Sequence, residues 1–221
     1  MEFFYGYPDE AQTVRFIAGT DAIQRADRTY DPKTGRPHEV QRNIAVCRQF
    51  GMAATPVVDW WARTLTFDAL IGNTDRHAEN WGLLRGGRDE SRATPEWVMA
   101  PAFDHGTSLG YEILEKDLQG YSEAAAIEKH ILKGRHHCTW ETTVEKRGEA
   151  FFSLCEKLCV AYPRIRDLIG RMIPVEDAPI GEIVSHWVNF DLPVKFSAAR
   201  ATFVERLIRA RRNTLATRLG L

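Results

Sequence analysis

Asp75 and Asn80 stand five residues apart in a polar segment, NTDRHAEN, that has apolar residues on both sides. Asp104 follows within the sequence FDHGTSLG. Carboxylate and amide oxygens are hard ligands that suit Mg²⁺, which keeps several waters and completes its shell with substrate phosphates. One Asp that orients a hydroxyl nucleophile, together with an Asn and a second Asp on the metal, forms a sufficient half-site for phosphoryl transfer. The three residues therefore predict Mg²⁺-dependent phosphoryl transfer.

Each of these residues also has a simpler interpretation. Asp75 could accept backbone N–H bonds within a turn, as acids in Asn-x-Asp clusters usually do. Asn80 could close the same turn, and His77 could be a structural histidine whose ring nitrogens are satisfied. Taken singly, these interpretations are the more ordinary ones. The joint occurrence of the polar segment and Asp104-x-Gly106 favours a catalytic site.

The elements around these residues are expected to be mostly helical. Apolar periodicity and helix-end signals predict helices on both sides of the polar segment, with Thr55 as a cap and Pro56 at a first helical position. Two short apolar runs, WGLLR and WVMAPAFD, predict a hairpin joined by a turn-rich connector over residues 86–96. Residues 1–36 contain several Pro and Gly residues and are expected to be irregular. The predicted helices span residues 39–50, 56–70, 122–134, 143–162 and 197–220.

Composition limits the classes of protein that fit this sequence. The 221 residues are 44% hydrophobic, which is enough for one substantial core. The 29 basic and 30 acidic residues nearly cancel, so net charge gives no reason to expect nucleic acid or an anionic membrane as the main partner. Four scattered cysteines predict no disulfide framework. With no signal peptide and no long apolar run, we expect a cytoplasmic protein without a membrane segment.

Other candidate sites carry weaker signals. The neighbours His136, His137 and Cys138, with Cys155 and Cys159, contain zinc-ligand types, but adjacent residues do not easily converge on one tetrahedron. We expect the two later cysteines to be core or surface residues, and Trp60 and Trp61 to pack the helix beneath the polar segment. The arginines of the last helix are interpreted as a solvated face, and direct nucleic-acid binding is not expected. They are Arg200, Arg206, Arg209, Arg211, Arg212 and Arg218.

The quoted motifs resemble a known family. The protein-kinase pattern has an Asp, an Asn five positions later, and then a metal-binding Asp ahead of a Gly. LIGNTDRHAENWGLL followed by MAPAFDHGTSLG resembles the HipA-type serine/threonine kinases, and more distantly the phosphoinositide lipid kinases. The resemblance implies a mainly α (α+β) fold, a kinase-like C-lobe formed by a helical bundle with a small β-hairpin at the catalytic loop. It also implies Asp75 as catalytic base, Asn80 and Asp104 as Mg²⁺ ligands, and His77 as a brace of the loop.

The resemblance also divides the chain and implies its partners. Residues 1–36 resemble the segment that enters the C-lobe from the hinge, where Glu2 and Phe4 would contact ATP, and residues 37–221 resemble the C-lobe itself. The sequence has no Gly-x-Gly-x-x-Gly and no Lys in a strand-like apolar run. We therefore expect the N-terminal lobe to be absent, and the isolated chain to be weakly active or inactive unless a separate polypeptide supplies that lobe.

Three functions follow as hypotheses. The first is a kinase half that transfers the ATP γ-phosphate to a protein Ser or Thr. The second is a pseudokinase-like module that binds a protein partner such as a HipB-like antitoxin. The third is a small-molecule kinase of the aminoglycoside type. That type typically has His before the catalytic Asp, whereas His77 follows Asp75, so the third hypothesis is disfavoured.

Overall fold

The computed structural model describes residues 15–85, 96–141, 148–173, 177–191 and 193–221. The chain forms two compact units, each assembled from separate parts of the sequence. The first comprises Met1–Trp61, Asp75–Asp104 and His137–Gly148. The second comprises Ala62–Thr74, His105–His136 and Glu149–Leu221.

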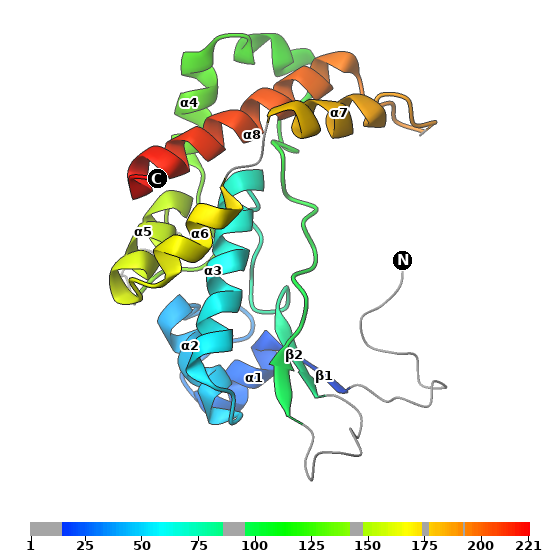
Figure 1. Ribbon diagram of the computed structural model, residues 1–221. Helices are drawn as coiled ribbons and strands as arrows, with labels where there is room; N and C mark the ends of the chain where they lie inside the picture. The colour runs from blue at the N-terminus through cyan, green and yellow to red at the C-terminus, as the bar shows by residue number, and fades with distance from the viewer. Residues whose placement is uncertain (1–14, 86–95, 142–147, 174–176, 192) are drawn as a thin grey trace. The chain divides into compact units, whose positions relative to one another are not determined.

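The first unit contains a three-stranded antiparallel sheet in the order β1-β2-β3 (Figure 1). Ala18 pairs with Gly82 in the sheet, and Leu83 pairs with Met99. The predicted hairpin is therefore confirmed as β2 and β3, while its connector over residues 86–95 lies outside the described residues. The elements of this unit are β1 (Arg15–Ala18), α1 (Gly19–Ala26), α2 (Val40–Gln49), the start of α3 (Ala54–Ile71), β2 (Gly82–Arg85) and β3 (Trp97–Met99).

The prediction that residues 1–36 are irregular is wrong for residues 15–26, which form β1 and α1. A strand of only four residues followed by a short helix gives little periodicity, so the sequence signal is weak. The strand is stabilised by pairing with β2, which comes much later in the chain. Helix α2 confirms the expected helix at residues 39–50, whereas α3 begins at Ala54, so Thr55 and Pro56 lie within its first turn.

Tight backbone packing joins α1 to the segment that precedes β2. The Gly19 amide donates to the Trp81 carbonyl at 2.8 Å, and the Thr20 amide donates to the Ala78 carbonyl at 2.9 Å. A Cβ at Gly19 would overlap the Trp81 ring and lie 2.6 Å from the Ala78 carbonyl. Trp81 is fully buried and contacts Trp61 edge to face, with 5.4 Å between ring centroids. The expectation that Trp61 packs beneath the polar segment is confirmed, and the neighbouring Trp60 indole donates to the Ala100 carbonyl at 2.7 Å.

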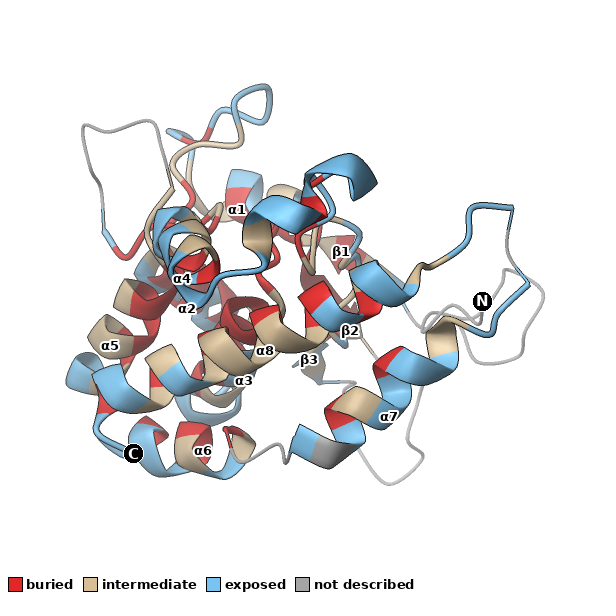
Figure 2. Ribbon diagram, turned by 90° about the horizontal axis from the view of Figure 1, so that it is seen from above, coloured by how far each residue is buried: buried red, intermediate tan, exposed pale blue. Residues whose placement is uncertain are grey.

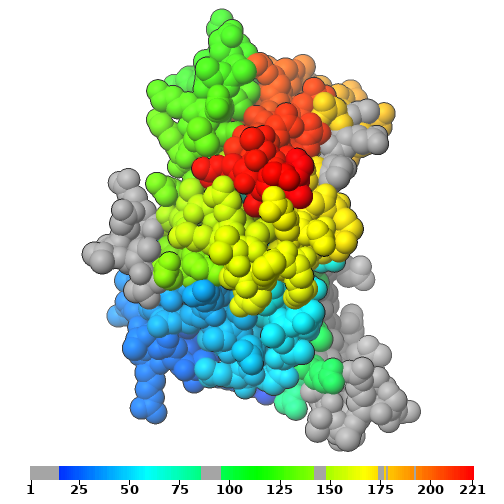
Figure 3. Space-filling model, turned by 60° about the vertical axis from the view of Figure 1, so that its left-hand side comes forward, coloured from blue at the N-terminus to red at the C-terminus, as the bar shows by residue number. Residues whose placement is uncertain are grey.

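The second unit is helical in its described residues. Helix α8 packs most extensively against η1, α4, α5 and α7. Figure 3 shows the end of α8 against α5 and α6, and Figure 2 shows buried and exposed positions alternating along α8. The elements of this unit are the end of α3, η1 (Glu115–Tyr121, a 3₁₀ helix), α4 (Ala124–Lys133), α5 (Phe151–Ala161), α6 (Ile165–Met172), α7 (Asp177–Trp187) and α8 (Ala198–Leu219).

Two predicted helices of this unit, α4 and α8, are confirmed, and the predicted helix at residues 143–162 needs a correction. Residues 143–147 lie outside the described residues, and α5 begins only at Phe151. The preceding residues are extended because they pair with another segment: the Glu149 carbonyl accepts the His136 amide at 2.7 Å. Cys155 on α5 is fully buried, and burial raises the pKa of its thiol far above the usual range, so it is a core residue as expected. Helices α6 and α7 and the 3₁₀ helix η1 were not expected from the sequence.

The interpretation of the α8 arginines as a solvated face is wrong for Arg211, which is only 3% exposed. Its guanidinium donates to the Ala69 carbonyl at 3.2 Å, near the C-terminal end of α3, and lies over the Phe151 ring. A cation is favoured at a helix C-terminus because the last carbonyls lack intrahelical partners. Burial lowers the pKa of Arg211 to about 10, so the group remains charged near neutral pH.

Among the residues that the structure describes, no helix is long and apolar enough to cross a membrane.

We predict that Gly19→Ala destabilises the protein, because the added methyl group has no space between Trp81 and Ala78. Overpacking of this kind typically costs about 1–3 kcal/mol. Urea unfolding would measure the loss. The control is Gly120→Ala in η1, where a Cβ meets nothing within 4 Å. Equal unfolding midpoints for the two variants would show that the Gly19–Trp81 approach does not constrain the fold.

Candidate functional site

The predicted catalytic loop closes on itself through Asn80. The Asn80 side-chain amide donates to the Asp75 backbone carbonyl at 2.7 Å, and the Asn80 backbone amide donates to the His77 carbonyl at 3.0 Å. Asn80 is buried, whereas the Asp75 side chain is 44% exposed. The loop therefore fixes the carboxamide of Asn80 and leaves the Asp75 carboxylate accessible.

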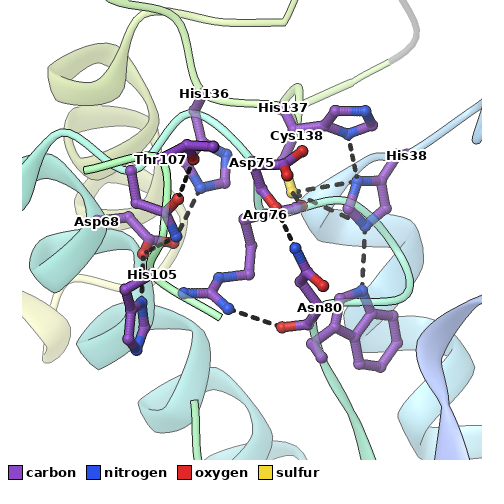
Figure 4. Close-up of polar contacts among 12 residues, drawn as sticks. His38, Asp68, Asp75, Arg76, Asn80, His105, Thr107, His136, His137 and Cys138 are labelled. Atoms are coloured by element: carbon purple, nitrogen blue, oxygen red, sulfur yellow. Dashed lines mark hydrogen bonds and ion pairs between the residues drawn. The ribbon is translucent and has the colours of Figure 1, made fainter. Parts of the chain in front are cut away.

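Arg76 joins this loop to the segment that carries Asp104. One guanidinium nitrogen of Arg76, Nη1, donates to the Asn80 carbonyl at 2.7 Å (Figure 4). The same nitrogen donates to the Phe103 carbonyl at 2.6 Å. The Arg76 side chain is fully buried, so the charge-assisted bond to Asn80 forms away from water, and the bond to Phe103 is partly buried. Asn80 and the residue that directly precedes Asp104 thus share one donor.

The segment around Asp104 is itself held in place. The Phe103 ring packs edge to face on Phe16, with 6.0 Å between centroids, in addition to the bond that Arg76 makes to its carbonyl. Asp104 has a φ of 55°, in the left-handed region that non-glycine residues rarely adopt and that Asp tolerates better than most. Such conformations persist where the surroundings fix them, and they cluster at functional sites. Asp104 is exposed, and its side chain has no hydrogen bond within the described part of the chain.

The side-chain oxygens of Asn80 and Asp104 are of the types that bind Mg²⁺. Because the Asn80 amide nitrogen is committed to the Asp75 carbonyl, the carboxamide oxygen is the atom left to bind a cation. No residue in the described ranges donates a hydrogen bond to that oxygen. One carboxylate and one amide oxygen, with waters and phosphates for the remaining positions, form a normal Mg²⁺ environment. The structure thus allows the predicted roles of Asn80 and Asp104.

His77 lies inside the loop as a structural element. Its Nδ1 accepts the Glu79 backbone N–H at 3.2 Å, so the proton of the neutral ring is on Nε2. That Nε2 lies 3.8 Å from the Asp75 carboxylate, beyond hydrogen-bond distance. His77 therefore braces the loop beside the Asp75 carboxylate.

A second buried cluster lies in the other unit, where Asp68 on α3 accepts hydrogen bonds on both oxygens. His136 lies 3.1 Å from one oxygen, and the Asn73 amide donates to the other at 3.0 Å. The Thr107 hydroxyl then donates to Asn73 at 2.9 Å. Asp68, Asn73 and His136 are almost fully buried. The cluster ties together Asn73, two residues before Asp75 in the chain, and Thr107, three residues after Asp104.

The remaining residues of the His-His-Cys sequence contact His38 in the first unit (Figure 4). His137 lies 3.2 Å from His38 between their Nδ1 atoms, and the Cys138 sulfur lies 3.4 Å from the same nitrogen. The Trp81 indole donates to the other nitrogen of His38 at 3.1 Å. An indole N–H can only donate, so the proton of His38 must be on Nδ1, where it prevents metal ligation by that atom. This hydrogen-bond pattern argues against zinc at these residues.

Among the described residues, His, Cys, Asp and Glu side chains form no group of three or more that could hold a metal ion. Glu2 and Phe4, which were expected to contact ATP, lie outside the described residues.

Several site residues escaped the sequence analysis. Arg76 lies in the quoted motif, but nothing in its spacing indicates that it is buried. Asp68 carries a clearer signal: a lone acid in the apolar helical sequence TLTFDALI needs a buried partner. His38 has no local signal, because its partners come from Trp81 and from His137, 99 residues away.

We predict that Arg76→Met destabilises the first unit, because two carbonyls lose their shared donor in a buried environment. Unsatisfied buried groups cost about 1–3 kcal/mol each, so for two carbonyls we expect a loss of about 2–6 kcal/mol in the free energy of unfolding. Chemical denaturation would measure the loss, with Arg28→Met at an exposed position as control. A loss no larger than that of the control would show that Arg76 does not hold the two segments together.

Comparisons with known proteins identify the family of this chain. The family model described as HipA-like C-terminal domain matches residues 13–174. The fold is similar to the crystal structure of a Helicobacter pylori proinflammatory kinase, CtkA, with a TM-score of 0.61 and 17% sequence identity over 94% of this chain and 72% of that chain. No curated protein matches the sequence. Because the family model covers well over half of its residues, the chain belongs to the HipA-like C-terminal domain family.

Proposed function

We propose that this chain is the catalytic part of an ATP- and Mg²⁺-dependent kinase that phosphorylates a Ser or Thr hydroxyl of a protein. Membership of the HipA-like family and the kinase-like fold support phosphoryl transfer as the reaction. In this proposal the described chain corresponds to a kinase C-lobe. A HipB-like antitoxin or a separate polypeptide that completes the nucleotide site is the proposed protein partner.

The proposed mechanism gives each loop residue one task. Asp75 accepts the proton of the acceptor hydroxyl, since its side chain is 44% exposed and it lies five residues before Asn80, whose side chain bonds to its backbone carbonyl. The Asn80 oxygen and the Asp104 carboxylate would hold Mg²⁺, which neutralises charge on the phosphates when bound. His77 keeps the loop in shape through the Glu79 amide. The protein contributes mainly position and electrostatics, as is usual for phosphoryl transfer.

The observation that carries this proposal is the pair of bonds from Arg76 to the Asn80 and Phe103 carbonyls. Asn80 and Asp104 are 24 residues apart in sequence, and two unrelated turn residues would have no reason to share a buried cationic donor. A common donor is what a site needs if both residues serve one ion. The exposed, left-handed Asp104 is consistent with a side chain that is held for a ligand.

We predict that Asp75→Asn lowers phosphotransfer by about 10²–10⁴-fold, because the amide cannot accept the hydroxyl proton. The assay follows transfer of labelled γ-phosphate from ATP to protein, with the full chain and any partner polypeptide encoded beside it. Asp191→Asn, at an exposed position, is the matched control and should leave the rate unchanged. If Asp75→Asn and the control transfer phosphate equally well, Asp75 is not the base.

A second candidate function is partner binding without catalysis, and one surface feature favours it. The first unit has a largely apolar groove of about 450 Å³ between the start of α3 and β3. Phe50, Trp60 and Trp97 line the groove, and Val98 on its wall is 50% exposed. Calorimetric titration with a HipB-like protein would separate the two functions: binding that ignores Mg²⁺ and ATP, without phosphotransfer, favours the binding module.

A further inference from the structure

His38 is fully buried and hydrogen-bonded at both ring nitrogens. The Trp81 indole lies 3.1 Å from Nε2, and because it can only donate, Nε2 must be the acceptor. The ring proton is then on Nδ1, which donates to Nδ1 of His137 at 3.2 Å. His137 must in turn present an unprotonated Nδ1. The chain of bonds runs in one direction, from Trp81 through His38 to His137, and it requires both imidazoles to be neutral.

This chain of bonds starts at Trp81, next to the proposed metal ligand Asn80. Trp81 directly follows Asn80, and its carbonyl accepts the Gly19 amide at 2.8 Å, so the indole is held by its ring and by its backbone. The Cys138 sulfur lies 3.4 and 3.8 Å from the two nitrogens of His38, against the ring, and it reaches the Arg76 carbonyl at 3.6 Å. The His38 ring therefore supports the segment directly at Trp81, and the Cys138 thiol beside the ring contacts the other end of the segment at Arg76.

A proton from solvent would reach this system at His137, which is half-buried, rather than at His38. His137 lines a cavity of about 200 Å³ beside the catalytic loop, and its ring contacts His77 edge to face at 5.9 Å. A proton on Nδ1 of His137 would point at the Nδ1 proton of His38, so the bond between the two rings would be lost. The titratable and charged groups around His137 include His38 and His77, whose rings contact it, and Arg36, which donates to its carbonyl at 2.8 Å. Tyr30, Lys33 and Glu79 line the same cavity, and Cys138 lies against His38.

We propose that His38 and His137 are positioning residues for the phosphotransfer, and that protonation of His137 loosens the Asn80 end of the loop and lowers the rate in acid. The kinetic part of this inference rests on the proposed function. The hydrogen-bond part does not, because it can be observed without catalysis.

The first experiment is long-range ¹H–¹⁵N NMR of the full chain with labelled histidine and tryptophan. At about pH 8, above the usual histidine pKa of about 6.5, His38 should carry its proton on Nδ1, which is the minor tautomer of free histidine. As the pH falls to about 5.5, the Trp81 indole N–H should shift with the titration of His137. A His38 ring protonated on Nε2, or a Trp81 signal that ignores His137, would overturn the proposal whether or not the protein is a kinase.

The second experiment compares pH–rate profiles, each normalised to its own rate at about pH 8. Below the transition, the wild-type rate should fall by about tenfold for each pH unit. His137→Gln retains an acceptor for His38 but cannot take up a proton, so its rate should fall less in acid than the wild-type rate. His186→Gln changes an exposed histidine of α7 and should keep the wild-type acid limb. An unchanged acid limb in His137→Gln would contradict the proposal. Absence of phosphotransfer in every form, including the wild type, would instead refute the proposed function and leave the NMR result to decide.

Discussion

The buried guanidinium of Arg76 is the interaction on which the site depends. It holds the carbonyls of Asn80 and Phe103 with a single nitrogen, at 2.7 and 2.6 Å. A buried charge is costly unless hydrogen bonds compensate it, and here those bonds join two segments that are distant in sequence. The loop needs Arg76 for its position, and Arg76 needs the two carbonyls to remain buried.

Buried histidines supply further support in each unit. His38 reaches the loop through Trp81 in the first unit, and His136 pairs with Asp68 in the second. These polar networks are satisfied by several partners, which is the condition under which a buried network rigidifies a site rather than weakening it. His136, His137 and Cys138, which are zinc-ligand types in the sequence, all take part in them. Hydrogen bonding therefore accounts for these three residue types without a metal ion.

The sequence predicted the parts of this protein that local signals specify. Helices α2, α3 and α4 follow from apolar residues at helical spacing, whereas α8 has little amphipathic pattern and is marked by its ends, a Ser197 cap and a terminal Gly220 with φ of 63°. The hairpin of β2 and β3 follows from two short apolar runs. Strand β1 could not be predicted because a four-residue strand depends on its pairing with β2. The late start of α5 likewise reflects pairing of Glu149 with His136.

Some residues of the candidate site could likewise be predicted from the sequence, and others could not. Asp75, Asn80 and Asp104 could be singled out from residue type and spacing, and the structure places Asp75 and Asn80 in one hydrogen-bonded loop. The residues that hold them, Arg76 and His38, could not be recognised, because burial and partners of distant sequence define their roles. The burial of Arg211 could not be predicted either. It belongs to a series of arginines in the sequence, yet it is buried against α3.

Manganese binding tests the central claim most directly, because Mn²⁺ replaces Mg²⁺ and gives an electron paramagnetic resonance signal. The full chain would be titrated with Mn²⁺ in the presence of a non-hydrolysable ATP analogue. The account predicts one tight site that Asn80→Ala and Asp104→Asn each weaken, and that Arg76→Met also weakens in protein that remains folded. If Asn80→Ala and Asp104→Asn leave the Mn²⁺ affinity unchanged, the two residues do not share an ion and the account is wrong.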